Sequence, residues 1–260
     1  MTGIPRGVLA AEWIKLRSVR STWVLLGCAL VLGLGDAVLS TSSVVHAWPT
    51  MSARDRLAFD PVGAALDGLS FGVLAFGALG ALVVAAEHGT GMIRTTLTAV
   101  PRRGVLFGAK AVVVGAVSLV LGESIAFVAF AAGQAVLSGA HLGVGLADPG
   151  VLRAVSGAGL YLSVVALVGL GLGALLRHSA AAITAMFGVV FLAYAVGRVL
   201  ESWSYLPSRL VLANAADVVA QTHAWAPRPR LPSLAGAYLD LGLYLAVFLA
   251  AGAWRAGQDA

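Results

Sequence analysis

Long apolar stretches separated by shorter polar ones dominate the pattern of this chain. Six stretches approach or exceed the roughly 20 residues that a helix needs to cross the hydrocarbon core of a bilayer. They cover residues 22–40, 61–86, 104–137, 155–176, 180–200 and 233–254. The pattern predicts an all-α integral membrane protein with six transmembrane helices, in which residues 1–260 form a single transmembrane domain.

Composition strengthens this prediction. Hydrophobic residues make up 59% of the chain and charged residues only 11%, whereas a soluble domain carries about 25% charged residues. The formal net charge of +5 does not indicate nucleic-acid binding, because the arginines lie at the edges of apolar stretches rather than on one face.

The distribution of basic residues predicts the orientation. Ten of the 17 lysines and arginines fall in the amino terminus, residues 87–110, the turn at 177–179 and the carboxyl tail. The positive-inside rule therefore places both termini in the cytoplasm of a multi-pass protein of the cell (plasma or inner) membrane. Residues 201–232 then form the largest outer loop, and its helix-like centre, 207–220, is too short to cross and either lies on the outer surface or dips inward.

The amino-terminal segment, residues 1–21, is polar and basic. Leu9, Trp13 and Leu16 share one helical face, which is typical of an amphipathic helix lying along the membrane interface. A disordered basic start that only sets the topology is the alternative.

The second polar segment on this side is the loop at 87–103. Its middle has Ile93, Leu97 and Val100 on one helical face, with Thr90 as a capping residue and Pro101 as a terminator. We expect a short amphipathic helix across the cytoplasmic ends of two membrane helices, where a soluble partner could push on it.

Glycines at 169, 171 and 173 thin one face of the fourth span. Small residues at this spacing let membrane helices approach closely. Tight helix packing is therefore favoured over a hinge.

Catalytic signatures are missing from the sequence. Neither lysine lies in a G-x-x-x-x-G-K-[ST] loop, the five histidines form no H-E-x-x-H, and no G-x-S-x-G is present. We expect no catalytic residues, no metal site and no cofactor bound by this chain.

Ionisable residues inside the apolar stretches are the remaining candidates for chemistry, because a charge at the centre of a membrane helix costs about 2.5–3.5 kcal/mol. The candidates for a substrate path are Glu123, Asp36, Asp67 and Asp240. The three aspartates lie in the outer thirds of their spans. They form either an acidic outer vestibule or groups that reach interfacial water or pair with outer arginines. For Glu123, a functional role and a structural pairing both remain open.

Two motifs together resemble a known family. EWIKLRSVRSTW runs from Glu12 to Trp23, and E-x-x-x-G-M-I-R-x-T-L-x-x-x-P-R-R runs from Glu87 to Arg103, followed by Ala109-Lys110. In a six-span chain of this length they resemble the permease subunit of ABC-2 type ATP-binding cassette transporters, most closely those of GC-rich, actinomycete-like genomes. The motifs cover the first 110 residues, and only hydropathy extends the resemblance further.

The resemblance implies a role for each motif. The interfacial helix would include Glu12, Trp13, Lys15 and Arg17. The segment that couples to the ATPase would include Glu87, Gly91, Arg94, Pro101, Arg102 and Arg103. The chain itself would not be an enzyme, since ATP and Mg²⁺ would bind a separate P-loop ABC ATPase subunit. Two permease copies, in a homodimer or a heterodimer, would form the substrate path in the lipid bilayer, and export is the expected direction.

Two other functions remain open. An ion-coupled secondary transporter would use Glu123 and the aspartates and would need no ATPase. A non-transporting membrane scaffold or immunity protein would tolerate mutation of Glu123 and would stimulate no ATPase.

Overall fold

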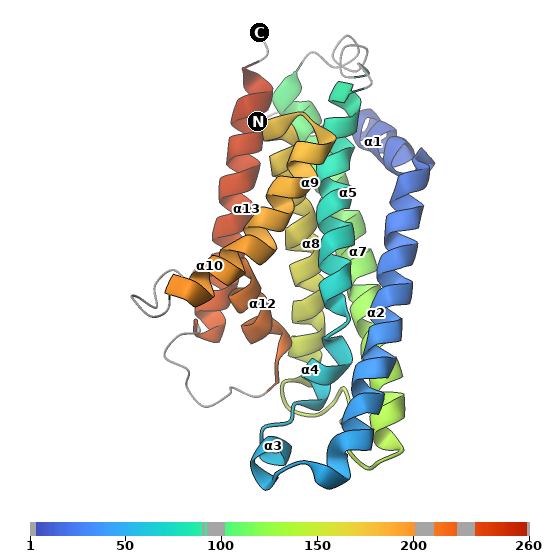
Figure 1. The fold of residues 1–260 in the computed structure, drawn as a ribbon. Helices are drawn as coiled ribbons and strands as arrows, with labels where there is room; N and C mark the ends of the chain where they lie inside the picture. The colour runs from blue at the N-terminus through green and yellow to red at the C-terminus, as the bar shows by residue number, and fades with distance from the viewer. Residues whose placement is uncertain (1–3, 90–91, 93–101, 201–210, 223–231, 259–260) are drawn as a thin grey trace.

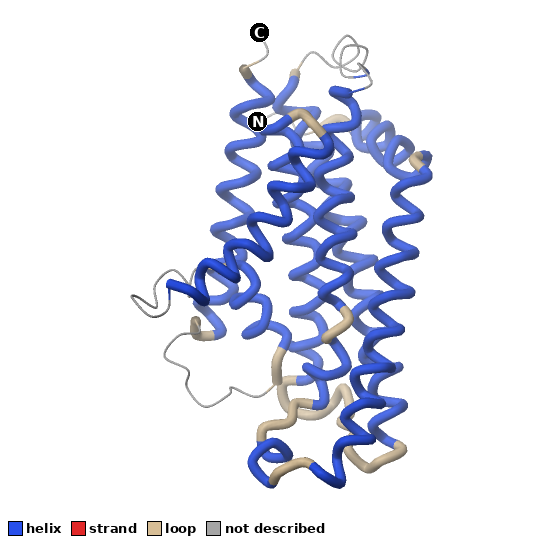
Figure 2. The backbone as a smooth tube through the Cα atoms, viewed as in Figure 1, coloured by secondary structure: helices blue, strands red, loops and turns tan. Residues whose placement is uncertain are grey.

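The structure is a computed structural model that describes residues 4–89, 92, 102–200, 211–222 and 232–258. The described residues form helices joined by short loops and contain no strand (Figure 2). Figure 1 shows long helices running side by side in one bundle. In chain order the elements are α1 (Arg6–Ser18), α2 (Arg20–Ala47), the 3₁₀ helix η1 (Trp48–Thr50), α3 (Ala53–Leu57), α4 (Pro61–Leu66), α5 (Leu69–Gly89), α7 (Arg103–Ser138), α8 (Val151–Leu176), α9 (Ser179–Phe187), the π-helix η2 (Gly188–Leu192), α10 (Ala193–Leu200), α12 (Leu212–Ala220) and α13 (Leu234–Gly257).

Six helical segments among the described residues are long and apolar enough to cross a membrane, which confirms the predicted number and the all-helical class. They are Arg20–Thr50, Leu69–Gly89, Arg103–Ser138, Val151–Leu176, Ser179–Val196 and Leu234–Gly257. At 1.5 Å per residue, the 21 residues of α5 extend about 31 Å, which matches the roughly 30 Å hydrocarbon core.

Helix α8 lies at the centre and contacts α5, α7, α9, α12 and α13. Glycines let its backbone approach two neighbours. A methyl group placed on Gly169 would overlap the Gly77 carbonyl of α5, and one on Gly171 would overlap the Phe248 carbonyl of α13. The glycines of α8 therefore serve tight packing on two faces, not on the single face expected from their spacing.

The second predicted span, 61–86, differs from the structure because it is interrupted at Asp67 and Gly68. Helix α4 starts on the Asp60 side chain, which accepts a hydrogen bond from Val62 N at 2.9 Å. At the break, Gly68 packs against the Gly33 carbonyl of α2, where any larger side chain would overlap it. Asp and Gly are poor helix formers, and the break lies where α2 approaches closely.

Helix α12 is the described part of the helix-like centre of the predicted outer loop, and it packs inward. Leu212, Ala215 and Val219 are fully buried, and α12 contacts both α8 and α13. Its last turn is held by Arg153 of α8, which donates hydrogen bonds to the Val219 oxygen at 3.2 Å and the Gln221 oxygen at 2.6 Å. A cation at the carboxyl end of a helix satisfies carbonyls that lack helical partners.

One end of the bundle carries the first motif and both flanks of the second. Figure 1 places α1, the carboxyl end of α5, the start of α7 and the end of α13 at the same end, with α3 at the opposite end. Glu87–Gly89 belong to α5 and Arg103 belongs to α7, so both ends of the predicted 87–103 loop are helical. The expected short helix at 93–100 lies outside the described residues.

Candidate functional site

A network of four charged side chains joins three helices at this end of the bundle. Lys110 of α7 contacts Glu12 Oε2 of α1 at 2.6 Å and Glu87 Oε1 of α5 at 2.7 Å. Lys15 of α1 contacts Glu12 Oε1 at 2.8 Å and the same Glu87 Oε1 at 3.0 Å. Two carboxylates and two ammonium groups balance, so the charge network of Glu12, Lys15, Glu87 and Lys110 is formally neutral.

Three of the four side chains are removed from solvent. Glu12 and Lys110 are each 3% exposed and Glu87 is 5% exposed, whereas Lys15 is 28% exposed. Buried charges persist in proteins when they are paired and hydrogen-bonded. Each lysine bridges both carboxylates, so every charge in the network has two partners of opposite sign.

Local sequence positions explain how the charge network forms. Glu12 and Lys15 are three residues apart on α1, which places them on the same helical face. Glu87 lies in the last turn of α5, where the helix dipole disfavours a carboxylate, so it needs cations from outside its own helix. Lys110 supplies one of them from about two turns inside α7.

Electrostatics favour the charged form of Lys15. Burial by itself would lower its pKa, but hydrogen bonds and charges from Glu12 and Glu87 outweigh burial and raise the pKa above the ordinary 10.5. Lys15 therefore stays protonated in the folded protein at neutral pH.

Glu87 keeps one acceptor unused among the described residues. Its Oε1 receives both lysines, whereas the buried Oε2 has no hydrogen-bond partner there. A buried carboxylate oxygen that accepts no bond is uncommon in folded proteins. It leaves this position able to accept a further donor where α5 leads into segment 90–101.

The structure separates the other residues predicted at this end. Trp13 and Arg17 of α1 are exposed and line a groove instead of joining the charge network. Arg102 is exposed and Arg103 is half-buried. Gly91, Arg94 and Pro101 lie outside the described residues. Lys110 was missed as a site residue, although it is one of only two lysines and belongs to the second motif.

A second candidate site is a cavity of about 340 Å³ bounded by α4, α5, α8, η2, α10 and α12. Asp67 and Asp217 line it together with Tyr161 and Tyr194. We call it the outer cavity, because α4 and α12 lie toward the end of the bundle away from α1 (Figure 1), which is the predicted outer end. Asp217 escaped the sequence analysis because it belongs to a loop helix rather than to an apolar span.

The four acids predicted for a substrate path do not converge on this cavity. Asp67 lines it and accepts a hydrogen bond from Ser40 at 3.4 Å. Asp36 lies beside the helix break, with its Cβ 3.0 Å from a methyl group placed on Gly68. Glu123 packs instead against Gly159 of α8, and Asp240 is half-buried on α13. Of these four acids only Asp67 lines the cavity, and the acidic vestibule stays a prediction.

Comparisons with known proteins give no family assignment. No protein-family model matches the chain, and no curated protein matches it. Function is therefore inferred from the charge network, the outer cavity and the two sequence motifs.

Proposed function

We propose that this chain is the membrane-spanning permease subunit of an ABC-2 type ATP-binding cassette transporter. In this proposal it forms part of the substrate path of an exporter and is driven by a separate ATPase subunit. The two motifs suggest the family, and six apolar helices suit a multi-pass membrane protein. The basic residues near α1, α7 and the end of α13 favour a cytoplasmic location for that end.

The charge network is the observation that carries the proposal. It ties together α1, the end of α5 and the start of α7, and the last two are the helices joined by segment 90–102. A force applied to that segment would reach both of its flanking helices and, through Glu12 and Lys15, helix α1. Buried ion pairs with several hydrogen bonds resist separation, so the three helix ends would move as one unit.

Backbone packing would carry this movement further into the bundle. Helices α5 and α8 touch without intervening side chains at Gly80, where a methyl group would overlap the Ala166 carbonyl, and at Gly173, where it would overlap the Ala81 carbonyl. Closely packed interfaces shift as rigid bodies because they have little room to deform. Motion of α5 would thus displace α8, which lines the outer cavity with Ala158 and Tyr161.

The decisive test is association with an ATPase. The full chain should co-purify with a P-loop ATPase, and reversing the charges of Arg94 and Arg102 to glutamate should abolish association while leaving membrane insertion intact. Reversal of Arg54 and Arg56, two exposed arginines of α3 at the opposite end, is the matched control and should have no effect. If the Arg94/Arg102 variant still binds the ATPase and its hydrolysis still responds to substrate, the coupling role is refuted.

An ion-coupled carrier is the second candidate, favoured by the two carboxylates in the outer cavity. A carrier would transport in vesicles that contain only this chain and an ion gradient, without nucleotide. Transport under those conditions would replace the permease proposal. A scaffold or immunity protein would show neither nucleotide-driven nor gradient-driven transport.

A further inference from the structure

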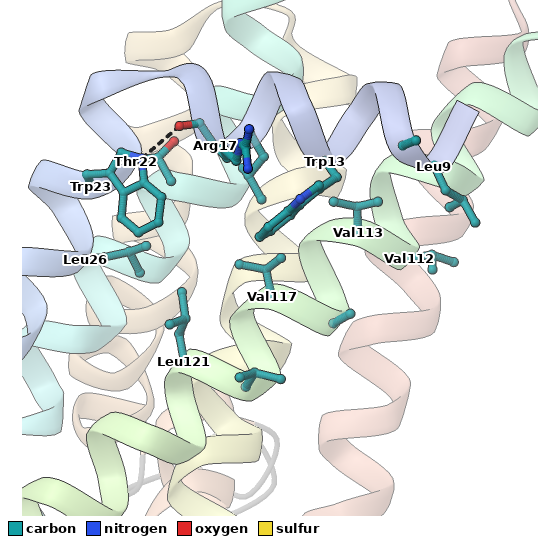
Figure 3. A pocket seen from close by; sticks show the side chains of 14 residues that line it. Leu9, Trp13, Arg17, Thr22, Trp23, Leu26, Val112, Val113, Val117 and Leu121 are labelled. Atoms are coloured by element: carbon teal, nitrogen blue, oxygen red, sulfur yellow. Dashed lines mark hydrogen bonds between the residues drawn. The ribbon is translucent and has the colours of Figure 1, made fainter. Parts of the chain in front are cut away.

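Helix α1 borders an apolar groove beside the face that joins the charge network. Between α1, α2 and α7 lies a groove of about 570 Å³, shown in Figure 3. We call it the α1 groove. Its lining is almost entirely apolar and includes Leu9 and Trp13 of α1, Leu26 of α2 and Val113, Val117 and Leu121 of α7.

One end of the α1 groove is basic and aromatic. Arg17 and Trp23 both line it and are both exposed, and Trp23 Nε1 donates a hydrogen bond to the Arg17 main-chain oxygen at 2.8 Å (Figure 3). None of the ion pairs within the described chain includes Arg17. Tryptophan and arginine together are typical of the headgroup level of a membrane.

The length of the α1 groove matches one leaflet. Its lining on α7 extends from Val112 to Leu121, which corresponds to about 14 Å along the helix axis. This is close to half of the roughly 30 Å hydrocarbon core. The α1 groove is thus apolar over the depth of one leaflet and positively charged where headgroups begin.

We propose that the α1 groove binds one anionic phospholipid, with an acyl chain between α2 and α7 and its phosphate at Arg17. Charge complementarity selects this occupant, because a neutral apolar molecule would leave the Arg17 guanidinium without a counter-charge at the mouth. A bound lipid contacts α1 on the face of Trp13 and Arg17, next to the face that carries Glu12. It thereby keeps α1 in position for the charge network.

The test compares binding of phosphatidylglycerol and phosphatidylcholine with identical acyl chains to the purified full chain, by native mass spectrometry. Wild type should retain phosphatidylglycerol preferentially. Arg17→Gln should reduce that preference about fivefold, the factor expected for one basic residue near an anionic lipid. Arg6→Gln, an exposed arginine of the same helix outside the α1 groove, should leave the preference unchanged.

A second variant tests the apolar part independently. Ala116→Phe places a ring inside the α1 groove and should reduce retention of both lipids, whereas Ala131→Phe, at an exposed position of α7 outside it, should not. Equal retention of the two lipids by wild type would overturn the proposal, as would unchanged phosphatidylglycerol binding in Ala116→Phe. A change of oligomeric state in Ala116→Phe with lipid binding intact would assign the α1 groove to a second copy of the chain and also overturn it.

Discussion

Replacing Lys110 with methionine gives the sharpest test of the charge network. The substitution keeps an unbranched side chain of similar length but removes the ammonium group that touches Glu12 at 2.6 Å and Glu87 at 2.7 Å. Two carboxylates then share only Lys15, which is the most exposed member. The charge network changes from neutral to one uncompensated negative charge.

The expected loss of stability is about 3–5 kcal/mol, the usual cost of removing one partner from a buried ion pair. At an effective dielectric constant of 20, each contact of Lys110 contributes about 6 kcal/mol of Coulomb attraction. Desolvation of the buried ions offsets several kcal/mol of that attraction per ion. The net loss therefore reflects mainly the carboxylate that remains buried without a full partner.

Reversible unfolding in mixed detergent micelles, followed by circular dichroism, measures the free energy of unfolding of each variant. The double variant Lys110→Met/Glu87→Gln restores a neutral network of Glu12 and Lys15 and should recover a large part of the loss. Arg6→Met removes an exposed cation from α1 and should change stability by less than about 0.5 kcal/mol. If Lys110→Met costs no more than Arg6→Met, or if the second substitution adds to the loss, the charge network does not hold the three helices together.

Two further predictions concern Lys15 and the α5–α8 contact. A pKa raised on folding adds stability that is fully present below the ordinary pKa and is lost as the pH rises through the folded pKa. Because folding raises the pKa of Lys15 above 10.5, the difference in unfolding free energy between wild type and Lys15→Gln should be constant near neutral pH and shrink above about pH 10.5. A difference that instead shrinks on acidification toward neutral pH would contradict the assignment. Gly80→Ala should destabilise the bundle by about 1–3 kcal/mol through overpacking, because the added methyl group meets the Ala166 carbonyl and the Leu170 nitrogen. Gly27→Ala in α2 is the control and should be neutral or stabilising, since nothing lies within 4 Å of the added methyl group. Equal unfolding free energies for the two variants would refute direct backbone contact between α5 and α8.

Hydropathy by itself determined the helical class and the number of long apolar helices. About 20 predominantly apolar residues have one stable solution in a bilayer, a helix that satisfies its own backbone hydrogen bonds. Only a short turn, Arg177-His178, separates α8 from α9. A turn this short makes the two helices antiparallel neighbours. These properties depend on residues close together in the chain.

The partners of each helix depended on tertiary structure. In a membrane helix nearly every face is apolar, so periodicity does not tell which face meets protein and which meets lipid. Glu12 and Lys110 are 98 residues apart, and Thr222 donates to Asp60 across 162 residues; only the packing of the helices brings them together. The sequence marked Glu12, Lys15 and Glu87 in two separate motifs, and the fold joined them through Lys110, because a buried carboxylate at the end of α5 needs cations that its own helix does not supply.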